Sequence, residues 1–223
     1  MGYHRAGFEV VGVDINPQPN YPFEFHRLDA MTLAPQSSHR CWHPGKRTNS
    51  ADCLGAFDVI HASPPCQHYS TATGKSRQHL YPDLVGRVRE LLISAGVPYV
   101  IENVPGSPLS TTFVLCGSMF GLRVRRHRLF ESSFLVMPPR CAHKTQGEPV
   151  GVYGMGGAYR ERASGGSRGN KAAPAQYAEL MEMPWAEPSE IRLAIPPAYT
   201  EYIGTQLLQH LGQPLSSPVK EDL

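Results

Sequence analysis

The sequence predicts an α/β protein built on a doubly wound, mostly parallel sheet. Apolar runs typical of buried strands, at 57–62 and 98–104, lie on either side of a segment with helical spacing of apolar residues. This strand–helix–strand alternation is typical of parallel sheets covered by helices. Residues with reactive or acidic side chains lie near or just after the carboxyl ends of both runs. The carboxyl ends of strands are where ligands bind in such sheets.

Each further element follows from its local pattern. Residues 10–14 read as a short buried strand that ends at Asp14, and 23–29 as a weaker strand that ends at Asp29. Apolar residues at helical spacing predict a helix over about 82–95, which Gly96 should stop. The remaining predicted elements are a strand at 113–116 and helices at 175–183 and 197–211.

The intervening segments divide the chain into three regions. We expect a core at 1–130, an irregular module at 131–172, and C-terminal helices at 173–223 that complete the core. Residues 35–56 and 68–80 read as loops, and the tail from 212 as frayed. The glycines at 151–157 could mimic a phosphate loop, but no strand-to-helix context frames them, so a plain loop is the preferred interpretation.

Composition favours a globular protein with one core. The chain has 223 residues, of which 41% are hydrophobic and 18% charged. We find no apolar stretch of membrane-spanning length and no secretory signal, and so expect a cytoplasmic monomer with reduced thiols. The net charge of +2 does not itself indicate nucleic-acid binding, although arginines gather at 123–128.

The segment Ser63-Pro64-Pro65-Cys66-Gln67 is the most informative in the chain. Two prolines cannot extend a central strand, so the chain should turn and present Cys66 at the strand end. Glu102 ends the next predicted strand. A thiolate can attack an electrophilic carbon while a nearby carboxyl group protonates the substrate. The alternative is a buried structural cysteine beside an unrelated glutamate.

Three short motifs together resemble the DNA cytosine-5 methyltransferases. Pro65-Cys66-Gln67 is similar to the catalytic loop of that family, and Glu102-Asn103-Val104 to its acid motif. The segment 124–128 is similar to its Gln-x-Arg-x-Arg motif, with Val124 in place of the glutamine. The resemblance covers about 2–130 and, more loosely, 175–211, and it implies the sheet of S-adenosylmethionine-dependent methyltransferases. It also implies that residues 131–172 occupy the place of the family's target-recognition region.

The resemblance implies a catalytic role for four residues. Cys66 would add to C6 of cytosine, which makes C5 nucleophilic, and Glu102 would favour protonation at N3. Arg128 would bind the base near O2, and Arg126 would hold phosphate or the catalytic loop. The base must leave the helical stack to be reached. The arginines could instead form only a solvated face.

The resemblance also implies binding residues. Asp14, Asp29 and Pro64 would contact S-adenosylmethionine, the two carboxylates at its ribose and adenine. DNA would be contacted by the catalytic loop and the arginines, namely Gln67, Ser70, Lys75, Arg126 and Arg128. Acids at strand ends often cap helices instead, which is the alternative for Asp14.

We expect no metal site. The five cysteines are an odd number without framework spacing, which argues against a disulfide scaffold. Cys41-Trp42-His43, Cys53 and Cys141-Ala142-His143 could suggest zinc, but their spacing fits no common zinc motif. Loop residues without a ligand are the preferred interpretation.

One part of the family pattern is missing. No Phe-x-Gly-x-Gly segment is present, and Met1-Gly2-Tyr3 resembles the helix after the Gly-rich turn that contacts the methionine part of the cofactor. The absent strand lies in the middle of the family's sheet, so we expect weak cofactor binding. The motifs together predict a cytosine-5 methyltransferase or a truncated form of one; the alternatives are an inactive DNA-binding remnant and a related fold acting on RNA.

Overall fold

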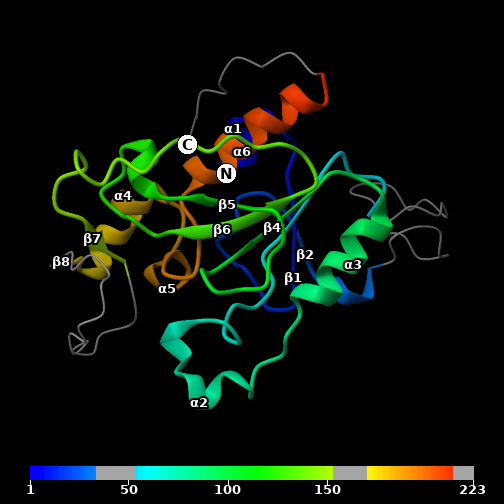
Figure 1. Cartoon of the computed structure of the whole chain (residues 1–223), viewed down its shortest axis with the longest axis horizontal. Helices are drawn as coiled ribbons and strands as arrows, with labels where there is room; N and C mark the ends of the chain where they lie inside the picture. Colours follow the sequence, from blue (N-terminus) through cyan, green and yellow to red (C-terminus); the bar gives the residue numbers. More distant parts are fainter. Residues whose placement is uncertain (34–53, 153–169, 213–223) are drawn as a thin grey trace.

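The computed structural model describes residues 1–33, 54–152 and 170–212. In these residues a mixed four-stranded sheet and two two-stranded parallel sheets, β1-β2 and β7-β8, are accompanied by helices, which confirms the α/β class (Figure 1). Most of the predicted loop at 35–56, most of the glycine segment at 151–157 and the predicted tail lie outside the described residues.

The larger sheet has the strand order β3-β4-β6-β5. β3 (Ile60–Ala62) and β4 (Tyr99–Asn103) are parallel, whereas β6 (Arg128–Ser132) is antiparallel to both β4 and β5 (Thr112–Leu115). This sheet is therefore mixed and not mostly parallel. The difference comes from β6, which the sequence analysis did not predict and which contains the expected boundary at 130. After the 3-10 helix η3 (Gly117–Phe120), the chain returns and inserts between β5 and β4.

One of the two-stranded sheets pairs β1 (Val11–Asp14) with β2 (Glu24–Arg27) in parallel. Among the described residues, β1 forms a ladder only with β2, and β3 only with β4. The N-terminal helix α1 (Gly2–Arg5) links this region to the larger sheet, because the Tyr3 hydroxyl lies 2.8 Å from Nδ1 of His61 in β3.

Helices cover both faces of the larger sheet. Consecutive residues of β4 point to opposite faces, so Val100 joins one buried cluster and Ile101 joins another. α3 (Val85–Ala95) packs on the Ile101 face, and Gly96 stops it as predicted, with a left-handed backbone conformation. α6 (Pro197–His210) packs on the Val100 face through its buried residues Tyr199, Ile203 and Leu207. The other buried members of this cluster are Leu115, Phe130, Phe134 and Val136.

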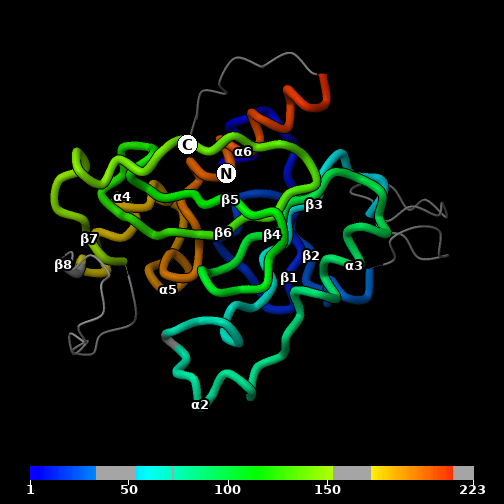
Figure 2. The backbone as a smooth tube through the Cα atoms, viewed as in Figure 1, coloured from blue at the N-terminus to red at the C-terminus, as the bar shows by residue number. Residues whose placement is uncertain are grey.

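Helices α1 and α6 lie side by side, as the tube in Figure 2 shows, although they come from opposite ends of the described chain. Glycines permit this contact. A Cβ atom on Gly2 would lie 2.0 Å from the Pro197 carbonyl oxygen, and one on Gly204 would lie 2.8 Å from Cβ of Ala6. The C-terminal helix α6 therefore contributes side chains to the buried core.

A third buried cluster lies beside the sheet. Its residues lie in or next to β7 (Val150–Gly151), β8 (Asn170–Lys171), α4 (Tyr177–Met181) and α5 (Pro188–Ile191). The predicted helix at 175–183 is observed as the 3-10 helix η4 (Pro174–Gln176) followed by α4. The members of the cluster are Leu122, Val124, Val152, Ala172, Tyr177, Met181 and Ile191.

The remaining elements are short. The 3-10 helix η1 (Ala30–Thr32) follows β2, and η2 (Thr71–Thr73) and α2 (Lys75–Gln78) lie within the predicted loop at 68–80. None of the helices in the described part of the chain has both the length and the apolar character needed to cross a bilayer.

Candidate active site

Cys66 lies in a turn after the carboxyl end of β3, as the two prolines predicted. It is a half-buried free cysteine. The turn is fixed to the neighbouring strand, because Nδ2 of Asn103 donates a hydrogen bond of 2.9 Å to the Pro64 carbonyl oxygen. Asn103 is almost fully buried at the end of β4. The predicted nucleophile loop and the predicted acid strand are therefore joined directly.

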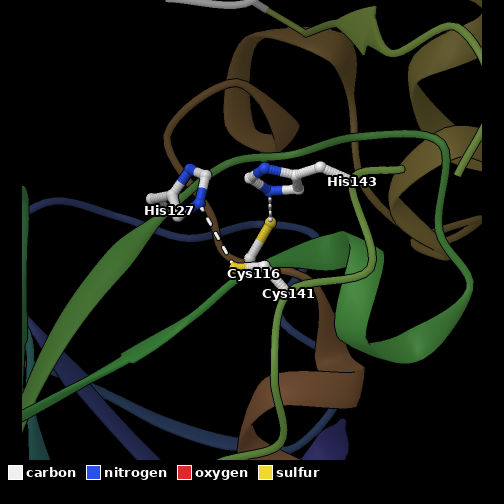
Figure 3. Close-up of side chains that lie close together, drawn as sticks. All are labelled: Cys116, His127, Cys141 and His143. Atoms are coloured by element: carbon white, nitrogen blue, oxygen red, sulfur yellow. Dashed lines mark hydrogen bonds between the residues drawn. The ribbon is translucent and has the colours of Figure 1, made fainter. Parts of the chain in front are cut away.

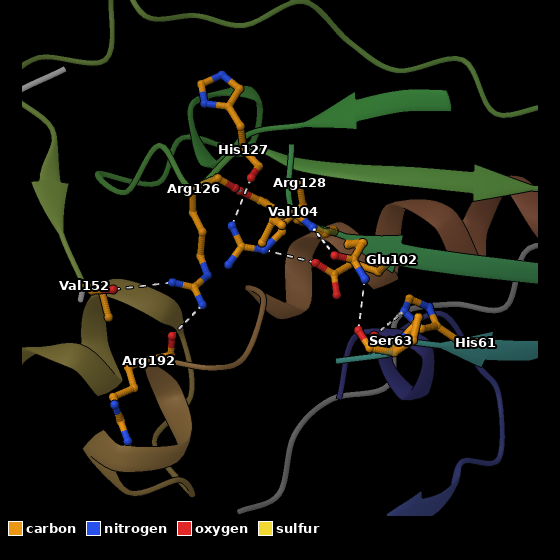
Figure 4. A network of polar contacts seen from close by, with 12 residues as sticks. His61, Ser63, Glu102, Val104, Arg126, His127, Arg128, Val152 and Arg192 are labelled. Carbon is orange, nitrogen blue, oxygen red and sulfur yellow. Dashed lines mark hydrogen bonds and ion pairs between the residues drawn. The ribbon is translucent and has the colours of Figure 1, made fainter. Parts of the chain in front are cut away.

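Glu102 is buried beside Arg128 in this same region (Figure 4). The Nε atom of Arg128 lies 3.0 Å from Oε1 of Glu102, and the Ser63 hydroxyl also hydrogen-bonds the carboxyl group. Burial raises the pKa of Glu102 above its ordinary value, and the opposing effects of Arg128 and Ser63 are smaller. A carboxyl group in this environment holds its proton more readily than one in water, as a general acid must.

A chain of hydrogen bonds extends from Glu102 back to the N-terminal helix. Ser63 Oγ lies 3.3 Å from Nε2 of His61, whose Nδ1 lies 2.8 Å from the Tyr3 hydroxyl. Burial lowers the pKa of His61 to about 4, so the ring is neutral at physiological pH. A neutral ring has one N–H donor and one acceptor, so these contacts connect the carboxyl group to α1 without adding a second charge.

Arg126 points away from Glu102 (Figure 4). Its buried guanidinium donates to the carbonyl oxygens of Arg192 at 2.7 Å and Val152 at 3.4 Å. The backbone of Arg126 has a positive φ of 30°, and the buried Tyr199 hydroxyl donates to its carbonyl oxygen at 2.9 Å. In this structure Arg126 joins the third buried cluster to the start of β6, and its predicted contact with phosphate stays a prediction.

The predicted cofactor carboxylates lie at the carboxyl ends of β1 and β2. Asp14 accepts hydrogen bonds from Asn16 N at 2.8 Å and Gln18 Nε2 at 3.2 Å. Asp29 caps η1 by accepting a hydrogen bond of 2.9 Å from Met31 N. Both acids therefore have the local turn or cap role that was the alternative interpretation for Asp14, and neither is brought into contact with Cys66 or Glu102 by any hydrogen bond.

The three other predicted DNA contacts lie on the loop after Cys66. Gln67 and Lys75 are exposed and Ser70 is half-buried. The loop is closed by local hydrogen bonds, including one of 3.1 Å from Gln78 Nε2 to the Ser70 carbonyl oxygen. These residues thus lie on the chain segment that directly follows the nucleophile, and their contact with DNA stays a prediction.

A shallow cleft of about 420 Å³ lies at the opposite, amino-terminal ends of β1 and β2. Apolar, acidic and histidine residues line it, with His4, Phe8, Glu9 and Phe23 among them. None of the predicted catalytic or cofactor residues lines this cleft, so it gives no support to the proposed chemistry.

The structure also assembles a cluster that the sequence analysis did not predict. Cys116, His127, Cys141 and His143 each direct one ligand-type atom toward a common point, and these four atoms lie within 4.8 Å of one another (Figure 3). Burial raises the pKa of the Cys116 thiol, but hydrogen bonds from His127, Ser118 and His143 outweigh it and lower the pKa to about 6. The Cys-x-His pair at 141–143 was the available signal; Cys41, His43 and Cys53 lie outside the described residues.

Compared with known proteins, the chain matches no family model and no curated protein. The functional argument therefore depends on the residues and on the geometry that joins them.

Proposed function

We propose that the chain is an S-adenosylmethionine-dependent DNA cytosine-5 methyltransferase with Cys66 as its nucleophile. The observation that carries this proposal is the junction of two strand ends. The Asn103–Pro64 hydrogen bond holds the Cys66 turn against β4, and the Arg128–Glu102 pair stands beside it. A nucleophile, an acid with a raised pKa and a fixed cation thus gather at one edge of the sheet.

The proposed reaction needs each of these groups. The thiolate of Cys66 adds to C6 of a cytosine that has left the helical stack, and Glu102 donates a hydrogen bond or proton at N3 as negative charge builds there. C5 would then take the methyl group of S-adenosylmethionine, which would leave as S-adenosylhomocysteine. Loss of the C5 proton to solvent, return of the N3 proton to Glu102 and elimination of the thiolate restore the aromatic ring and free Cys66. Arg128 stabilises the base at O2 and holds the orientation of the Glu102 carboxyl group.

S-adenosylmethionine, when bound, supplies the methyl group, and the described residues fit its nucleoside half. Asp14 and Asp29 end adjacent parallel strands, at the edge where nucleotides bind in such sheets. A carboxylate offers about four acceptor positions, and Asp14 uses two of them for Asn16 and Gln18, so acceptor capacity for ribose hydroxyls is left.

A mechanism-based trap tests the proposal. Duplex DNA that contains 5-fluorocytosine cannot lose a proton from C5, so a covalent enzyme–DNA adduct should accumulate in the presence of S-adenosylmethionine. We expect a denaturation-resistant band with the wild-type chain and with the matched thiol variant Cys53→Ser. Cys66→Ser should form no such band. An adduct that persists in Cys66→Ser would refute the assignment of the nucleophile.

A DNA-binding remnant without activity is the second candidate. The interruption between β1 and β3 favours it, because a sheet that lacks ladder pairing at this point resembles the family's sheet without its central strand. The same experiment separates the two candidates. A remnant would retard DNA in a gel without forming an adduct, and Cys66→Ser would retard it equally.

A further inference from the structure

We infer that Cys116, His127, Cys141 and His143 form a structural zinc site. The four residues come from three segments: Cys116 directly follows β5, His127 directly precedes β6, and the other two lie in the loop after β6. Two thiols and two imidazoles are the ligand set that zinc prefers, and four protein ligands fill a tetrahedral site. The zinc site does not depend on the proposed methyltransferase activity.

The distances fit a tetrahedron around one ion. Zinc–sulfur bonds of about 2.3 Å and zinc–nitrogen bonds of about 2.05 Å place sulfur and nitrogen ligands about 3.6 Å apart. Nε2 of His143 lies 3.3 Å from Sγ of Cys116, and Nε2 of His127 lies 3.6 Å from Sγ of Cys141. Both histidines direct the same ring nitrogen inward, and the two rings are perpendicular with centroids 5.1 Å apart (Figure 3).

A polar side chain outside the four ligands supports the arrangement. Ser118 Oγ lies 3.2 Å from Sγ of Cys116 and also accepts a hydrogen bond of 3.2 Å from Ala142 N. Ser118 thus joins the buried cysteine to the loop that carries the other cysteine and its histidine. Such outer contacts orient the ligands of metal sites and are a regular part of them.

The position of the site explains what the metal would do. Residues 133–149 contain no helix or strand, and a metal ion would join their middle to the ends of β5 and β6. Ligand His127 lies between Arg126 and Arg128, and its carbonyl oxygen accepts a hydrogen bond of 3.0 Å from Nη1 of Arg128. Zinc would therefore fix the segment that aims Arg128 at Glu102, which makes His127 a positioning residue for that pair.

Metal analysis of the full chain tests the inference. The chain is purified with zinc in the growth medium and dialysed into metal-free buffer, and we expect about one zinc ion per chain by mass spectrometry. Exchange for cobalt should give the intense visible absorption of tetrahedral Co²⁺ and a thiolate-to-cobalt charge-transfer band. Chelation should lower the thermal unfolding midpoint, and added zinc should restore it.

Variants locate the ion. Cys141 is exposed, so Cys141→Ser should fold and lose the zinc, and His143→Ala should do the same. Cys66→Ser and Cys53→Ser are controls that remove a thiol outside the cluster and should keep the ion. Three results would each overturn the inference: wild-type protein without zinc or a cobalt spectrum, a disulfide between Cys116 and Cys141 in the purified protein, or zinc that is lost only with Cys53→Ser.

Discussion

The ion pair between α3 and β6 gives a sharp test of what holds the sheet to its helix. Glu131 is only 3% exposed, and its carboxylate accepts hydrogen bonds from Arg89 Nε at 2.8 Å and Nη2 at 2.7 Å, and from Ser110 N at 2.7 Å. Tyr99 adds a fourth contact at 3.4 Å. In Glu131→Gln the amide NH₂ must face one of these N–H donors, so at least one contact becomes repulsive.

The magnitude follows from the burial of the pair. Removing one partner of a buried ion pair costs about 3–5 kcal/mol, because the other charge stays buried without compensation. The Arg89 side chain is 23% exposed, so water recovers part of this cost, and we expect the lower end of the range, about 3 kcal/mol. Since single domains have unfolding free energies of about 5–15 kcal/mol, a loss of this size is readily measured.

Urea unfolding followed by circular dichroism measures the loss. Glu90→Gln is the matched control, because Glu90 is exposed on the same helix, and its effect should stay within about 0.5 kcal/mol. A loss below about 1 kcal/mol for Glu131→Gln would show that the pair does not carry the energy of a buried one.

The pH dependence gives an independent check of the same reasoning. Burial raises the pKa of Glu131, but the bonds from Arg89 and Ser110 outweigh it, so the pKa in the folded state is lowered. A lowered pKa stabilises the fold above the unfolded value, and this stabilisation is lost as the pH falls through the folded value. The difference between wild type and Glu131→Gln should therefore be constant near neutral pH and shrink in acid. A difference that does not change in acid would refute the assignment.

Two further predictions concern the candidate active site. Glu102→Gln should lower methyl transfer by about 10²–10⁴-fold and leave DNA affinity nearly unchanged, as rate and gel-shift measurements can show; equal losses of both would indicate a structural role. Tyr199→Phe should destabilise the fold by about 1–3 kcal/mol in urea unfolding, because the buried carbonyl oxygen of Arg126 loses its donor, and no loss would mean that water replaces the hydroxyl group.

Local sequence patterns predicted the elements whose signal is local. The helix expected at 82–95 is observed at Val85–Ala95, the strand expected at 98–104 at Tyr99–Asn103, and the helix expected at 197–211 at Pro197–His210. In each of them apolar periodicity and a glycine or proline near an end act over a few residues. The proximity of the Cys66 turn to the Glu102 strand was also predictable, because the carboxyl ends of neighbouring parallel strands meet at one edge of a sheet.

β6 could not be predicted in this way, because its sequence, Arg-Leu-Phe-Glu-Ser, carries a charge at a position that the fold buries. Glu131 is tolerated inside because groups distant in the sequence reach it, above all Arg89 from α3 and the Ser110 N–H. The Cys116–His143 cluster escaped prediction on similar grounds. Its ligands come from three segments, so their spacing follows from the path of the chain and not from a local zinc-binding loop.

Two features that the sequence did not predict, strand β6 and the Cys116–His143 cluster, meet at the start of β6. Variants in β6 can therefore distinguish a loss of fold stability from a loss of Arg128 orientation. β6 begins with Arg128, which pairs with Glu102, directly after His127 of the cluster, and Glu131 near its other end is bound to α3. A variant that loosens β6 through Glu131 should lower stability throughout the sheet. Loss of the His127 side chain should instead change the orientation of the Arg128 guanidinium relative to Glu102. If both variants reduced methyl transfer only in proportion to the fraction of folded chain, the arrangement of Arg128 would have no catalytic importance of its own.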